Sequence, residues 1–252
     1  KFGLWLKLTY NPSMKKILFL TILSLATTAV VADVGDNFVS IKLGTSNSND
    51  AGITTAISAV DKVAEMTNND LGSSDILGIG VGKYFSETFR GEINISQRKG
   101  FKYATTHAKT DGVAETDHRV SADIESLTFF VSGYVDSQPI SLFQTSVTPY
   151  FGIGAGVSNN KMGPLDVTQT IDGVSLGNLS SNTETEFAFK FALGVLMNLA
   201  DNVSVDLNYQ YVDLGDIKSG TNLSWDSRDL KAPYSGAEIT SNEFNVGLQI
   251  LF

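Results

Sequence analysis

Hydrophobic residues alternate with polar or small residues along most of this chain, and a period of two is typical of β-strands whose two faces meet different surroundings. The clearest segment is "FNVGLQILF", residues 244–252. One of its faces is entirely apolar and carries Phe244, Val246, Leu248, Ile250 and Phe252. A strand of this kind needs an apolar environment along that face.

Eight segments show this alternation, and those with clear ends are about 9–11 residues long, the length that a tilted strand needs to cross a bilayer. They are residues 38–44, 77–85, 89–97, 127–135, 147–157, 186–197, 203–211 and 241–252. Because single-chain barrels of bacterial outer membranes close with an even number of antiparallel strands, the pattern predicts a closed ring.

The connections between these segments alternate between short and long, as in outer-membrane barrels. Residues 86–88, 137–145 and 198–202 are the short turns, and residues 45–76, 98–126, 158–185 and 214–240 are the long loops. Asp111-Gly112 and Asp172-Gly173 are strong hairpin signals, so we expect the second and third long loops to be hairpins that extend the strands beyond the lipid. In the first long loop, Ile53, Ile57, Val60 and Ala64 recur at helical spacing and predict a short amphipathic helix over the barrel mouth.

Alternation alone does not say which face lies inside, because a soluble lipocalin-like barrel keeps its apolar face inward whereas a membrane barrel turns it outward. The size of the residues separates the two. The polar faces are rich in glycine and alanine, as in the run Gly152, Gly154 and Gly156, which suits a narrow interior. We therefore predict an all-β, eight-stranded antiparallel transmembrane up-and-down barrel with four long extracellular loops and three short periplasmic turns.

The N-terminal region has the pattern of a secretory signal peptide. Lys15 and Lys16 follow Met14, and the apolar stretch Ile17–Val31 comes next. A transmembrane anchor is the alternative, but the strongly apolar part, Ile17–Leu25, is too short to span a bilayer. We expect residues 1–13 to be an upstream or ill-defined segment, residues 14–32 the signal peptide, and residues 33–252 a barrel domain in the cell outer membrane.

The charge balance is acidic, with a formal net charge of −9 over 252 residues. Residues 33–252 contain 14 Lys and Arg against 27 Asp and Glu, and this excess of acid argues against a nucleic-acid partner. The chain has no cysteine, so no disulfide contributes to its stability.

Charged residues also fall on the faces that would line the lumen. They are Lys42, Arg90, Glu92, Lys190 and Asp206. Their mixed signs predict a paired network that plugs a narrow barrel, since buried charges without partners are costly. A gated ion path through the same residues is the alternative.

Catalytic chemistry has little support in the sequence, and we expect no cofactor, no metal site and no catalytic residue. The histidines, His107 and His118, fall in the second long loop, with Asp117 and Ser121 nearby. A Ser, His and acid set is defined by geometry rather than by spacing, so this proximity leaves a lipid-modifying hydrolase at the barrel rim only as a minor alternative.

The chain resembles the outer-membrane surface-antigen and opacity-porin superfamily, whose barrel is of the OmpA-like type. The resemblance rests on the signal peptide, "YFGIGAGV" (150–157), "YQYVDLG" (209–215) and the terminal "FNVGLQILF". It implies a non-enzymatic surface protein whose variable loops serve adhesion, surface recognition and envelope integrity, with a narrow porin or small-solute channel as the alternative.

The resemblance also implies the partners. Phe252 resembles the terminal signature that the barrel-assembly machinery recognises, and the apolar row before it (Phe244, Val246, Leu248 and Ile250) would aid insertion. The expected partners are therefore outer-membrane lipid, the assembly machinery and a host or surface ligand bound by the loops, with the chain itself a monomer.

Overall fold

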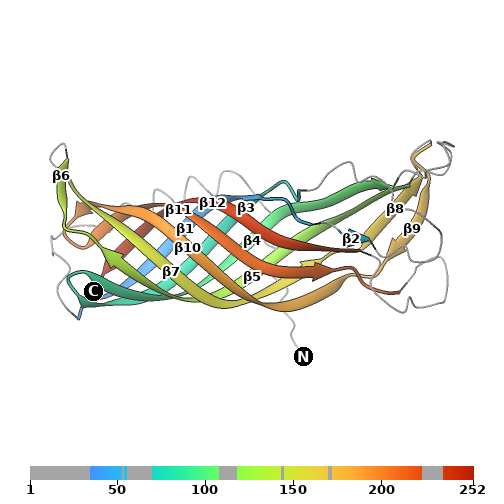
Figure 1. Ribbon diagram of the computed structural model, residues 1–252. Coiled ribbons are helices and arrows are strands. Elements are labelled where there is room, and N and C mark those ends of the chain that lie inside the picture. Colours follow the sequence, from blue (N-terminus) through green and yellow to red (C-terminus); the bar gives the residue numbers. More distant parts are fainter. Residues whose placement is uncertain are drawn as a thin grey trace, which may run out of the picture.

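The computed structural model describes residues 35–52, 54–55, 70–107, 118–142, 145–169, 172–222 and 235–252, and within these residues no helix is long and apolar enough to span a membrane. Eight long strands form a ring (Figure 1). They are β1 (Asn37–Ser48), β3 (Ser73–Ser86), β4 (Phe89–His107), β5 (His118–Asp136), β7 (Thr145–Met162), β10 (Asn182–Ala200), β11 (Val203–Lys218) and β12 (Ser235–Leu251).

The ring closes between its first and last strands, and every pair of neighbours is antiparallel. β12 pairs with β11 on one side and with β1 on the other, in a register that runs from Phe38 opposite Leu251 to Ser48 opposite Ser241. All backbone edges of the eight strands are thus paired, which is the condition for strands to cross hydrocarbon. The predicted eight-stranded antiparallel barrel is confirmed.

The apolar faces point outward, as the size of the residues predicted. Phe187 and Leu193 of β10 are 66% and 60% exposed, and Ile79 of β3 is 59% exposed. The alternate positions are buried inside the ring, including the charged residues Arg90, Glu92 and Asp206. The apolar row that ends the sequence therefore lies on the outer wall.

Glycines inside the barrel leave room for large neighbouring rings. A Cβ atom on Gly82 would collide with the ring of Phe38, and one on Gly152 would collide with the ring of Tyr134. At these two positions the small inner residue therefore makes room for an aromatic ring, whereas Gly80 and Gly154 make room for Glu92 and Lys190.

The second long connection, residues 98–126, extends the two strands as a paired ribbon, as predicted, because β4 and β5 continue to His107 opposite His118. A β-bulge at Gly100, which has a φ of +128°, shifts the register of β4. Before Gly100 the even-numbered residues of β4 face inward. After Gly100 the odd-numbered residues Phe101 and Tyr103 face inward. A second bulge near Gly215 of β11, with a φ of +74°, changes the phase in the same way.

The third long loop contains the predicted hairpin, and the hairpin also pairs with β5, which was not predicted. β8 (Leu165–Gln169) and β9 (Ser175–Leu179) pair with each other, and β8 also pairs with β5. The turn includes Asp172 and Gly173, and the Gly173 N–H donates to the Gln169 carbonyl over 3.0 Å. The other predicted hairpin turn, Asp111-Gly112, lies outside the described residues.

Two of the remaining connections each contain a short strand that pairs with a strand of the ring. β2 (Thr54–Thr55) pairs with β12, so the predicted helix is wrong at these two residues, while most of its other positions lie outside the described ranges. β6 (Ile140–Leu142) pairs with the start of β7 and lies at the end of the barrel opposite β8 and β9 (Figure 1). We call these the short-turn end, with β6, and the long-loop end, with β8 and β9.

Candidate functional site

The lumen near the short-turn end is closed by one arginine and a group of aromatic rings. The Arg90 guanidinium pairs with Asp136 at 3.0 Å and lies 4.3 Å from the ring centre of Tyr134 and 4.6 Å from that of Tyr150. Tyr134 and Tyr150 meet edge to face at 5.5 Å. An arginine can hold this position because its planar cation stacks on rings while it binds a carboxylate.

Farther along the lumen, the Glu92 carboxylate accepts from three side chains, two on β1 and one on β5. The Lys42 ammonium lies 2.8 Å from the Glu92 carboxylate, the Tyr134 hydroxyl donates to it over 2.7 Å, and Ser40 also donates to it. Glu92 is 2% exposed, and multiple donors are what make a buried carboxylate tolerable.

The other two predicted charges have different partners. Asp206 accepts a hydrogen bond from the Tyr150 hydroxyl over 2.6 Å. The Lys190 ammonium lies 5.0 Å from the ring centre of Phe130, and within the described ranges no carboxylate forms an ion pair with it. Of the five charges predicted to form a network, the structure therefore joins Lys42 to Glu92 directly and gives Arg90, Asp206 and Lys190 other neighbours.

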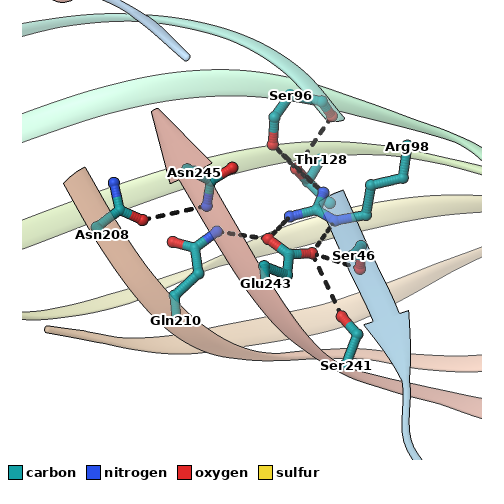
Figure 2. A network of polar contacts seen from close by, with 9 residues as sticks. All are labelled: Ser46, Ser96, Arg98, Thr128, Asn208, Gln210, Ser241, Glu243 and Asn245. Atoms are coloured by element: carbon teal, nitrogen blue, oxygen red, sulfur yellow. Dashed lines mark hydrogen bonds and ion pairs between the residues drawn. The ribbon is translucent and has the colours of Figure 1, made fainter. Parts of the chain in front are cut away.

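A second buried ion pair lies toward the long-loop end (Figure 2). The Arg98 and Glu243 side chains meet in two parallel contacts, one of them Nη2 to Oε2 at 3.0 Å. Arg98 also donates to Thr128 over 3.1 Å, and Glu243 accepts from Ser46 over 2.9 Å and from Gln210. Five strands thus contribute to one hydrogen-bonded cluster across the barrel.

Above this cluster the interior becomes apolar. Phe101 and Tyr103 of β4, Ile124 of β5 and Leu214 of β11 are among the fully buried side chains there. Leu165 of β8 belongs to the same hydrophobic cluster. The lumen therefore has three layers: aromatic rings at the short-turn end, polar and charged side chains in the centre, and apolar side chains at the long-loop end.

Sequence reasoning missed Arg98, Glu243 and Asp136. Arg98 had been assigned to a loop, although it continues the inward row of Arg90 and Glu92 by the same period of two. Glu243 likewise belongs to the inward row of the terminal strand, two residues before Asn245. A search that extended each alternation until its phase broke would have found both residues.

The predicted assembly signal lies on the outer wall of the closing strand. Phe244 and Phe252 are 52% and 73% exposed, and Val246 lies between them on the same row with Leu248 and Ile250. This placement leaves the row available to lipid, while the backbone of β12 is occupied by β11 and β1.

The candidate rim hydrolase residues are only partly described. His107 and His118 are backbone partners at the end of the β4–β5 ribbon, and Ser121 lies farther down β5. Asp117 lies outside the described residues. Among the residues that the structure describes, no group of three His, Asp or Glu side chains is arranged to hold a metal ion.

The closed ring, the outward apolar wall and the buried polar centre define a membrane β-barrel, and sequence comparison gives the family. Residues 17–252 match the outer membrane protein beta-barrel domain, and the chain belongs to this family.

Relatives and solved structures agree with this assignment. A Rickettsia rickettsii protein named "Putative adhesin" is 27% identical over 176 residues, which cover 69% of this chain and 72% of the relative. A Rickettsia typhi protein of the same name is 30% identical over 149 residues, covering 57% and 60%. The crystal structure of OprG from Pseudomonas aeruginosa matches with a TM-score of 0.57 at 16% identity, covering 88% of this chain and 98% of OprG, and this likeness concerns the fold.

Proposed function

We propose that this protein is a surface-recognition protein of the adhesin type, in which the barrel is a sealed anchor and the long-loop end binds a partner on a host or neighbouring cell. The observation that carries the proposal is the extension of β4, β5, β8 and β9 beyond the lipid-facing wall. Binding residues commonly lie on such projections from a rigid scaffold.

The outer face of the sheet changes from apolar to charged where the extension begins. On β5 the exposed apolar row stops at Leu127, and the next outward positions toward the long-loop end are Glu125 and Asp123. Lys99 of β4 pairs with Glu125 at 3.6 Å, with both side chains about half exposed. A charged outer face belongs in water, so this part of the sheet would project from the membrane.

The extension has an interior of its own, which would keep it ordered outside the bilayer. Phe101, Val120, Leu165 and Leu179 are fully buried in the hydrophobic cluster and come from β4, β5, β8 and β9. Burial of several large side chains stabilises such a sheet without lipid. Val174 and Leu176 at the β8–β9 hairpin are 53% and 36% exposed, which is the kind of apolar surface that a protein partner would cover.

The filled lumen supports a plug in preference to a channel. Arg90, Arg98, Phe101 and Phe130 are each at most 1% exposed inside the ring. The names of the Rickettsia relatives point in the same direction, toward adhesion. Catalysis has no part in the proposal, and envelope integrity would follow from the anchored barrel itself.

The test is attachment to cultured animal cells by a non-adherent Gram-negative host that displays the full chain. We expect attachment above that of the empty host, and we expect the double variant Val174→Ser with Leu176→Ser to lose most of it. Leu199→Ser is the matched control, because Leu199 is a similarly exposed apolar residue (56%) at the short-turn end. No attachment by the unmodified chain, or an equal loss in the control at equal surface levels, would contradict the proposal.

A further inference from the structure

The connection between β5 and β7 contains a strand of its own, β6, which forms a small hairpin with the start of β7. Ile140 lies opposite Val147, and Leu142 lies opposite Thr145. β7 pairs with β5 as far as Tyr150 and with β6 from Val147 on, so the hairpin prolongs the barrel wall at the short-turn end (Figure 1).

One face of this hairpin is apolar and continues the outer wall. Ile140 and Leu142 are 57% and 51% exposed. Val147, the partner of Ile140, belongs to the outward row of β7 that includes Phe151 and Ile153, which are about half exposed. Because directly opposed residues of two paired strands lie on the same face of the sheet, the apolar side chains of β6 point the same way as this lipid-facing row.

The other face of the hairpin is polar, and the whole segment is uncharged. Ser141 is exposed and lies opposite Ser146. Residues 137–147 contain no charged residue, whereas the other two short turns carry Glu87 and Asp201. A segment with one apolar face, one polar face and no charge is suited to the boundary between hydrocarbon and water rather than to water alone.

The neighbouring strand β10 indicates how far the lipid reaches on this side of the barrel. Its outward row is apolar from Phe187 to Leu199, and both of these end residues are more than half exposed. A strand rises about 3.3 Å per residue, so this row is about 40 Å long and, at a tilt of about 45°, spans about 28 Å of bilayer. The hydrocarbon core is about 30 Å thick, which places Leu199 at its border. Met197 of the same row lies opposite Val147, so β6 is at this border too.

We propose that the β6–β7 hairpin is a membrane-surface anchor: Ile140 and Leu142 enter the lipid of the leaflet at the short-turn end, and Ser141 faces the water beyond it. Continuity with the lipid-facing wall selects lipid as the occupant, because Ile140, Val147 and Met197 form one outward row across β6, β7 and β10. The third connection is thus a part of the lipid contact and differs in this from the charged turns at Glu87 and Asp201.

The test is spin labelling of single-cysteine variants, which is straightforward because the chain has no cysteine of its own. Each full-length variant carries a nitroxide label and is refolded into phosphatidylcholine vesicles. Collisions of the label with oxygen, which concentrates in hydrocarbon, are compared with collisions with a water-soluble nickel chelate. We expect the labels of Ile140→Cys and Leu142→Cys to favour oxygen, as does the label of Leu193→Cys on the outer wall. The label of Ser141→Cys should favour the nickel chelate.

Glu87→Cys is the matched control, because Glu87 lies in a short turn at the same end of the barrel and its label should favour the nickel chelate. Heat-modifiable migration on gels confirms that each labelled variant is folded. If the labels at positions 140 and 142 collide with nickel as readily as the label at position 87, the hairpin stands in water and the proposal is overturned. Protection of these two labels from both reagents would indicate a protein contact and would overturn it as well.

Discussion

The residues that most clearly define this barrel are the buried charges of its lumen. Arg98 and Glu243 are 1% and 0% exposed, and they are held by two parallel contacts and by hydroxyl and amide groups of neighbouring strands. Such a pair contributes little net stability compared with apolar residues of the same shape, but the loss of one partner leaves the other charge buried without compensation. The stability of the folded barrel therefore depends on both members being present.

Glu243→Gln should lower the free energy of unfolding by about 3–5 kcal/mol, because the Arg98 guanidinium would lose its charge partner inside the ring. Urea unfolding of the refolded protein in detergent micelles measures this difference. Glu125→Gln is the matched control, since it breaks the exposed pair with Lys99 and should cost about 0–1 kcal/mol. Equal unfolding midpoints for the two variants would show that Arg98 does not depend on Glu243.

At the scale of the elements, alternation revealed all eight strands and the face that each turns outward, because large apolar residues cannot share the narrow interior with the rings of Phe38 and Tyr134. The alternation did not predict the strand residues that follow a β-bulge, where the inward and outward positions exchange. The bulges at Gly100 and Gly215 interrupt the period of two, so the alternation on β4 ends near Gln97 and the continuation of the ribbon to His107 was predicted from the Asp111-Gly112 turn signal alone. A single-residue insertion of this kind gives no periodic signal.

Contacts between residues far apart in the chain also could not be predicted from the sequence. The pairing of β8 with β5 depends on a turn after Met162 that brings the hairpin back to a strand much earlier in the chain, where Asp166 lies opposite Ser121 and Gln169 opposite His118. Likewise, Lys42, Arg90, Glu92, Lys190 and Asp206 were recognisable as inward residues, but their actual neighbours depend on the register of the whole ring.

The terminal strand carries a prediction of its own. Deletion of Phe252 should reduce the amount of folded protein in the outer membrane of living cells, because the resemblance assigns that residue to recognition by the assembly machinery. Refolding of the same variant into detergent micelles should proceed normally, since most of the β12 register with β1 and β11 is retained. Heat-modifiable migration on gels measures both.

Phe187→Ala removes an equally large outward aromatic from β10 and serves as the control for that experiment, because Phe187 is 66% exposed and β10 does not pair with β12. Assembly of the Phe252 deletion at the rate of the unmodified chain would remove the evidence for a terminal signal. A refolding defect in micelles would instead assign the residue a role in barrel stability.

At the scale of the whole molecule, the barrel is closed around its circumference and filled along its axis. Rings stack around Arg90 at the short-turn end, ion pairs occupy the centre, and the apolar cluster that includes Phe101 and Leu214 closes the long-loop end. This order of layers separates the membrane anchor from the charged extension of β4, β5, β8 and β9, which is the part that we propose binds a partner.

Single-channel recording of the purified, refolded protein in a planar bilayer tests the sealed barrel most directly. We predict no conductance steps from the unmodified chain, because large side chains are buried at the short-turn end, in the centre and at the long-loop end of the lumen. Steady conductance steps whose ion selectivity changes with Lys190→Gln would contradict this result, since they would require a continuous water path through the ring.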